Sequence, residues 1–141
     1  MRRVSIVVVS NGDIKELEKS LASINRQKSN QCFTLEITVV FMNKGIKWNH
    51  NEHRWHHTQL LVLETEKDES PWLLGINQST GDYVAFMEAG EEWKKTRLEY
   101  QIHELNSQTG VKWVGGENCE INGKMIKKLD RWVFLKHFDK K

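Results

Sequence analysis

Hydrophobic residues alternate along the chain between unbroken β-branched runs and stripes with helical spacing. The run at 4–9 (VSIVVV) ends before Asn11-Gly12 and is typical of a strand covered on both faces. Similar hydrophobic runs predict four further strands, at 35–42, 59–64, 82–87 and 111–114.

Helical patterns separate several of these runs. Each has a capping residue, a terminating glycine or hydrophobic residues three or four positions apart. The residues that mark them are Asp13, Leu17, Leu21 and Ile24 for the first helix, Ser70, Pro71, Trp72, Leu73, Ile76 and Gly81 for the second, and Leu98, Ile102, Leu105 and Gly110 for the third. The rhythm predicts an α/β fold, a mostly parallel, doubly wound sheet of about five strands with helices on both faces.

The pattern changes after the fifth run. Asn122-Gly123 lies between two short runs and predicts a C-terminal β-hairpin. The last segment, 129–141, mixes hydrophobic and basic residues as a terminal amphipathic helix would. A length of 141 residues is enough for one domain with a core, so 1–141 is expected to be a single domain.

Composition narrows the functional classes. The chain has 21 Lys and Arg against 19 Asp and Glu, a formal charge of +2, which favours no nucleic-acid partner. Cys32 and Cys119 form neither a disulfide framework nor a CxxC metal motif, and this favours a reduced, cytoplasmic compartment. No hydrophobic stretch approaches the roughly 20 residues of a transmembrane helix, and the N-terminal run is interpreted as a buried strand rather than a signal peptide.

Ligands of open parallel sheets bind beyond the carboxyl ends of the strands. Three polar segments are expected to converge there, at 10–13, 43–45 and 87–92. The chain has neither GxGxxG after its first strand nor GxxxxGK[ST], which argues against a dinucleotide cofactor and a P-loop.

Four segments, in order, carry a resemblance to a known family. They are VSIVVVSNGDIKELEKSLASINRQ, EITVVFMNKG, LLGINQSTGDYVAFMEAGEEW and GVKWVGGENCEINGK. They are similar to the strand-and-helix opening ending in L-x-S-L-x-x-Q, the E-I-I-V-V-D-D-G-S strand, the A-x-G-E-Y-I-A-F-L-D-A-D-D-x-W strand and the subsequent hairpin of family-2 glycosyltransferases. The resemblance covers roughly residues 4–127.

This resemblance implies the nucleotide-binding part of a GT-A fold and a nucleotide-diphosphate sugar as ligand. It places Ser10, Asn11, Asp13 and Asn43 near the nucleotide. The family's D-x-D binds Mg²⁺ or Mn²⁺ through the diphosphate, because a divalent ion stabilises the negative charge of the departing group.

The sequence also departs from the family pattern. Phe41 and Met42 occupy the positions of two aspartates that meet the nucleoside, Val9 replaces a proline, and Glu88-Ala89-Gly90 replaces D-x-D. These departures leave two interpretations of the acidic turn. Glu88 and Glu91, or Glu92 in place of Glu91, form a weak, water-rich metal site, or these acids are a solvated turn on a scaffold that has lost its metal and uses no cofactor. The second is favoured.

Two functions therefore remain open. One is a glycosyltransferase-like protein that transfers a sugar from a nucleotide sugar to an unknown acceptor. The other is a catalytically inactive binding or assembly module, a pseudoenzyme that forms a homo-oligomer or joins a partner subunit. The catalytic base is unassigned, because the acids beyond the turn fit no recognisable motif, namely Glu117, Glu120, Asp130 and Asp139.

Two further groups of residues have simpler explanations. Four histidines at 50, 53, 56 and 57 have spacings that suit Zn²⁺ or Ni²⁺, but a surface helix with solvated histidines is favoured. Of the six tryptophans, which more often pack in cores than stack on sugars, only Trp93 is expected near the site.

Overall fold

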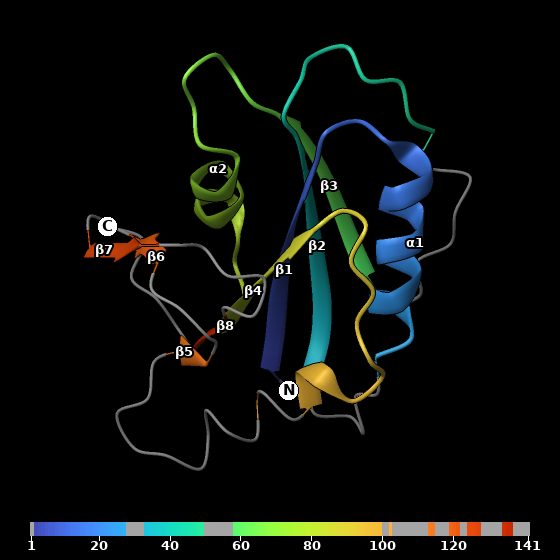
Figure 1. Ribbon diagram of the computed structural model, residues 1–141. Helices are drawn as coiled ribbons and strands as arrows, with labels where there is room; N and C mark the ends of the chain where they lie inside the picture. The colour runs from blue at the N-terminus through green and yellow to red at the C-terminus, as the bar shows by residue number, and fades with distance from the viewer. Residues whose placement is uncertain are drawn as a thin grey trace.

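The computed structural model describes residues 2–27, 33–49, 58–99, 102, 113–114, 119–121, 124–127 and 134–136. Its elements are β1 (Arg2–Ser10), α1 (Ile14–Asn25), β2 (Phe33–Phe41), β3 (Thr58–Glu64), α2 (Pro71–Gln78), β4 (Tyr83–Glu88), β5 (Trp113–Val114), β6 (Cys119–Ile121), β7 (Lys124–Lys127) and β8 (Phe134–Lys136) (Figure 1).

The main sheet has six strands in the order β3-β2-β1-β4-β8-β5. Strand β1 runs parallel to both β2 and β4, and β2 runs parallel to β3. Strand β8 is antiparallel to both of its neighbours, β4 and β5. The expected mostly parallel α/β sheet is therefore confirmed, and the three strands predicted to share one cleft lie side by side and point the same way.

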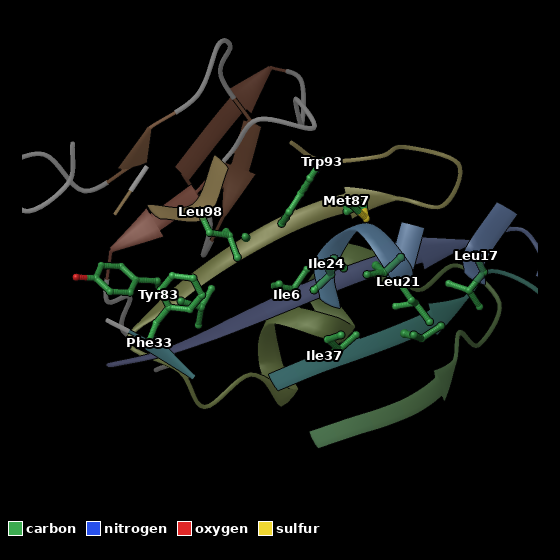
Figure 2. Close-up of a cluster of buried hydrophobic side chains, with 14 of the residues drawn as sticks. Ile6, Leu17, Leu21, Ile24, Phe33, Ile37, Tyr83, Met87, Trp93 and Leu98 are labelled. Carbon is green, nitrogen blue, oxygen red and sulfur yellow. The ribbon is translucent and has the colours of Figure 1, made fainter. Parts of the chain in front are cut away.

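Helices α1 and α2 cover opposite faces of this sheet. On one face, Ile6 and Val8 of β1 pack in a cluster with Leu17, Leu21 and Ile24 of α1 (Figure 2). On the other face, Val7 and Val9 pack with Ile76 of α2. The alternation of side chains along a strand explains why every residue from 4 to 9 is buried, and why the segment is an unbroken hydrophobic run.

Both predicted helix starts are confirmed. The Asp13 side chain accepts a hydrogen bond from the Glu16 N–H, and Ser70 accepts one from the Leu73 N–H. Each satisfies a backbone donor that has no partner within the helix. Inside α2, a Cβ at Gly75 would lie 2.3 Å from Cγ1 of Val7, so only glycine allows α2 to pack this closely on β1.

The C-terminal part confirms one expectation and corrects another. Strands β6 and β7 pair antiparallel, which confirms the hairpin, although Asn122-Gly123 lies outside the described residues. The terminal helix expected over 129–141 is wrong for Phe134–Lys136, which form β8 and pair with β4 at residues 83–85. Hydrogen bonds to β4 and β5 stabilise an extended conformation there, because β-pairing partners outweigh weak local helical preference.

The third expected helix is described only in part. Residues 97–99 and 102 are helical, and Leu98 and Ile102 are buried, whereas Leu105 and Gly110 lie outside the described residues. The histidine cluster between 50 and 57 also lies outside them. Within the described ranges, no helix has the length and hydrophobicity that crossing a membrane requires.

Candidate functional site

The loops after β1, β2 and β4 meet at the carboxyl edge of the sheet. Ser10 lies opposite Phe41 of β2, and Val9 lies opposite Glu88 of β4. Backbone hydrogen bonds continue beyond the strands, from the Met42 N–H to the Ser10 carbonyl and from the Ala89 N–H to the Val9 carbonyl, both at 2.9 Å. The structure therefore brings the predicted nucleotide-binding and metal-binding segments together around the end of β1.

Polar side chains in the loop after β1 hold the loop's own backbone. The buried Ser10 hydroxyl accepts the Gly12 N–H at 3.0 Å, and Asn11 Oδ1 accepts the Asp13 N–H at 3.1 Å. Asp13 Oδ1 in turn accepts the Glu16 N–H at 3.2 Å. Of these predicted site residues, Asn11 and Asp13 are exposed to solvent, whereas Ser10 is buried and holds the loop through its hydroxyl.

Glycine is required in this loop. Gly12 has a φ of 106°, and a Cβ there would lie 2.7 Å from Cδ1 of Ile46. The loop after β2 thus packs closely against the loop after β1, and the positive φ at this position favours glycine. Asn43 adds a polar link, because its Nδ2 donates to the Asn11 carbonyl at 3.2 Å.

A shallow cavity of about 480 Å³ opens beside these loops, between the ends of β2 and β3 and the start of α2. Its lining is Met42, Asn43, Lys44, Thr65, Glu66, Lys67, Asp68, Glu69 and Pro71. The lining carries two basic and three acidic side chains, so the cavity is not an anion site by charge alone. Lys44 pairs with Glu66 at 2.5 Å, and this hydrogen bond raises the pKa of the lysine.

The two positions where the family has aspartates are hydrophobic and differ in exposure. Phe41 is buried and packs edge-on against Trp48, with ring centroids 6.2 Å apart. Met42 is 52% exposed and lines the cavity. A ligand in this cavity therefore meets a thioether side chain where the family pattern provides a carboxylate.

The acidic turn after β4 uses one of its carboxylates on itself. Glu91 Oε1 accepts the Glu88 N–H at 2.8 Å, and the Glu91 N–H donates to the Glu88 carbonyl at 3.1 Å. Gly90, between them, has a φ of 108°, which residues with a side chain rarely adopt. The Glu88 side chain is exposed to solvent.

The carboxylates of Glu88 and Glu91 are chemically suited to bind a divalent cation. Hard cations such as Mg²⁺ are commonly held by one or two carboxylates together with water and substrate phosphates. Glu88 provides an exposed carboxylate at the carboxyl edge of the sheet, and Glu91 is the second carboxylate in the same turn. Among the described residues, no group of three Asp, Glu, His or Cys side chains is placed to enclose an ion by itself.

Sequence reasoning missed the polar residues of α1 that hold this turn. The buried Ser20 hydroxyl accepts the Gly90 N–H at 2.8 Å and donates to the Glu91 carbonyl at 2.6 Å. The buried Ser23 hydroxyl accepts the Trp93 N–H at 3.0 Å. The signal was present, because Ser23 is the serine and Gln27 the glutamine of the L-x-S-L-x-x-Q pattern.

Gln27 lies just beyond the end of α1 and extends this contact. Its amide nitrogen donates to the Lys94 carbonyl at 2.7 Å, and its amide oxygen accepts the Leu98 N–H at 3.1 Å. The residues after the acidic turn are thus bound to α1 through backbone atoms. Trp93 lies near the turn, but it is only 5% exposed and packs in the core, so it offers no open stacking surface.

A third carboxylate lies at the opposite, amino end of the sheet. Glu36 of β2 accepts hydrogen bonds from the Ser5 hydroxyl, from the Thr80 N–H at 3.0 Å and from the Thr80 hydroxyl at 2.7 Å. Partial burial alone would raise the pKa of Glu36, but these hydrogen bonds and the Arg3 charge outweigh it and lower the pKa. This acid ties β1 and β2 to the segment that precedes β4.

Comparison with solved structures identifies the fold. A mannosyltransferase from Pyrobaculum calidifontis, in complex with GDP-Man and Mn²⁺, superposes with a TM-score of 0.67 at 18% identity over 96% of this chain. The fold is GT-A-like. Residues 1–349 of S. aureus TarS, in complex with UDP, superpose with a TM-score of 0.63 at 14% identity over 95% of this chain.

Both solved structures are much longer than the part that this chain resembles. The chain spans 44% of the mannosyltransferase and 46% of the TarS fragment. No protein-family model matches the sequence, and no curated protein sequence matches it. At these identities the likeness establishes the arrangement of the chain and not its activity.

Proposed function

We propose that the chain is the nucleotide-sugar-binding part of a glycosyltransferase, and that it takes part in sugar transfer from a nucleotide-diphosphate sugar to an acceptor. The observation that carries this proposal is the meeting of three loops around the end of β1. There Glu88 lies opposite Val9, and the Met42 N–H donates a hydrogen bond to the Ser10 carbonyl. Ligand sites of open α/β sheets lie at this edge. Related support comes from the mannosyltransferase, whose structure holds GDP-Man and Mn²⁺.

Each predicted residue has a role that fits its geometry. Asn11 and Asp13 face solvent at the end of β1, where a nucleotide can reach them. Asn43 lines the cavity and ties its loop to that of Asn11, so the two loops are held in one arrangement before ligand binds. Such preorganisation reduces the entropic cost of binding.

Mg²⁺ or Mn²⁺ would be held by Glu88, with Glu91 as the second carboxylate of the turn. When bound, the ion would stabilise the negative charge that a departing nucleoside diphosphate develops. Ser20 keeps the turn in place by bonding Gly90 and Glu91, and so fixes the direction in which Glu88 leaves the sheet. The general base remains unassigned.

A specific observation favours a second candidate, a catalytically inactive module with the same fold. Phe41 and Met42 stand where the family pattern has two nucleoside-binding aspartates, and one carboxylate oxygen of Glu91 accepts a hydrogen bond from the Glu88 N–H. A scaffold that no longer binds nucleotide can keep its sheet and loops, because the core contacts do not depend on the ligand.

A thermal-shift measurement separates the two candidates. A ligand that binds only the native state stabilises it, by about 2.7 kcal/mol at 100 times its Kd. We expect UDP or GDP with Mn²⁺ to raise the melting temperature of the protein, and Glu88→Ala to remove the part of the shift that requires Mn²⁺.

Glu92→Ala is the matched comparison, because Glu92 is the exposed acid that the sequence offered in place of Glu91, and its Oε2 lies 3.9 Å from Lys19 Nζ. It should retain the shift. A melting temperature that no nucleotide changes at millimolar concentration, with or without Mn²⁺, would refute nucleotide binding and leave the inactive module. If binding is found, release of free sugar or its transfer to added acceptors then distinguishes an enzyme from a binding protein.

A further inference from the structure

Strand β3 is the outermost strand of the sheet on the side away from β4 (Figure 2). It pairs with β2 along one edge, from Leu35 opposite Thr58 to Phe41 opposite Glu64. Among the described residues, no strand pairs with its other edge. A strand in this position presents backbone N–H and C=O groups to which another extended chain can bond.

The sequence of β3 lacks the features that usually protect such an edge. Natural edge strands carry lysine, proline, a bulge or an inward-pointing charge. The first six residues of β3, TQLLVL, contain no charge and no proline, and the pairing with β2 runs without a register shift. The one charged residue, Glu64, is turned towards its own chain, where its carboxylate accepts the Gly45 N–H at 2.6 Å.

Leu61 stands out at the centre of this strand. It is 41% exposed, although its neighbours Leu60 and Val62 pack against one core cluster and Leu63 packs against the other. Leu61 and Leu63 point to the same face, the face of α2, because side chains alternate along a strand. That face is therefore covered at Leu63 and left open at Leu61.

We propose that β3 pairs with β3 of a second copy of this chain, antiparallel and centred on Leu61. Leu61 is the middle residue of Thr58–Glu64, so this register uses the whole strand. Leu61 then lies opposite Leu61 of the second copy, Leu60 opposite Val62, and Glu64 opposite Thr58. No like charges meet, and the two exposed leucines cover each other.

This arrangement is closed and self-complementary. A two-fold axis perpendicular to the sheet makes both copies use the same strand, as isologous dimers do. It also keeps the α2 faces of both copies on one side, because opposed residues in an antiparallel pair share a face. The carboxyl edge with Ser10 and Glu88 takes no part in the pairing, so the dimer does not depend on the proposed nucleotide binding.

Sedimentation equilibrium over a concentration series tests whether the dimer forms. We expect the apparent mass to rise with concentration from 16.6 kDa towards twice that value. Leu61→Lys should keep the protein monomeric, because it places two positive charges directly opposite each other across the axis. Leu73→Lys is the matched control, since Leu73 is 42% exposed but lies on α2, and it should dimerise like the unaltered protein.

Cysteine cross-linking tests the register. In a background with Cys32→Ser and Cys119→Ser, Leu61→Cys should form a disulfide between copies, because opposed Cα atoms in an antiparallel pair lie about 4.5 to 5.5 Å apart. Leu63→Cys alone should not, but it should cross-link when mixed with Gln59→Cys, its opposed residue. A monomer at every concentration, an association that Leu61→Lys leaves intact, or cross-linking that ignores this register would each overturn the proposal.

Discussion

At the amino end of the sheet, Glu36 accepts hydrogen bonds from two neighbouring segments, whereas at the carboxyl end the side chain of Glu88 projects into solvent. Both acids lie on strands that run parallel to β1: Glu36 of β2 is opposite Ser5, and Glu88 of β4 is opposite Val9. Position in the fold therefore gives them different uses. Glu36 stabilises the joint between β1, β2 and the start of β4, and Glu88 is available to a ligand.

The surroundings explain this difference. Near Glu36, the chain packs so tightly that a Cβ at Gly81 would lie 2.8 Å from the Arg3 carbonyl and from the Ser5 nitrogen. Near the carboxyl edge, a Cβ at Gly45 would meet nothing within 4 Å. Where the carboxyl-edge loops do pack closely, as at Gly12, an added Cβ would meet the end of the Ile46 side chain and not the backbone, so this edge is the more open of the two ends.

The largest expected effect breaks the closed end. Gly81→Ala should lower the free energy of unfolding by about 3 kcal/mol, because the new methyl group meets backbone atoms that cannot move aside without disturbing β1. Urea denaturation measures the change. Gly45→Ala is the comparison at the open edge, where only the strain of a positive φ remains, at about 1 kcal/mol. Equal losses for the two variants would show that the two ends are not packed differently.

A smaller effect tests the two acids directly. Glu36→Gln should cost about 1 to 2 kcal/mol of unfolding free energy, because an amide cannot accept all the hydrogen bonds from Ser5 and Thr80 that a carboxylate accepts. Glu88→Gln should change stability by less than about 0.5 kcal/mol, as substitutions on an open surface do. Chemical denaturation of both variants at neutral pH provides the measurement, and a Glu88→Gln loss as large as that of Glu36→Gln would contradict the comparison.

The smallest effect is a dependence on pH. The pKa of Glu36 is lowered from its usual value of 4.5, so the unfolded chain takes up this proton more readily than the folded one. Its contribution to stability is present above that value and is lost as the pH falls through the folded pKa. We expect Glu36→Gln to flatten the fall of the urea midpoint below about pH 4.5, and an unchanged fall in this variant would contradict the lowered pKa of Glu36.

The local elements could be predicted because their signals are local. The β-branched run at 4–9 needs only its own residues to favour a strand, and Asp13 and Ser70 cap helices through N–H groups three residues away. By contrast, Phe134–Lys136 form a strand because they meet Tyr83–Ala85, which their own sequence does not indicate. The expectation of a terminal helix failed for that reason.

The candidate site divides in the same way. The family pattern and the strand ends predicted that Ser10, Asn43 and Glu88 would come together at one edge, and the structure places them there. The roles of Ser20 and Ser23 could not be derived from periodicity, because their partners lie about 70 positions further along the chain. Their place on the hydrophobic stripe of α1 hid their polar function.

The sequence by itself determined the strands and helices from β1 to β4, where α1 and α2 begin, and which polar residues come after the parallel strands, since hydrophobic periodicity and capping act over a few residues. Only the tertiary structure decided the order of the strands, the use of Glu36 as a joint and the exposure of Glu88 and Leu61. These properties depend on which distant segment supplies a hydrogen bond or covers a side chain. Such segments come together only when the whole sheet packs.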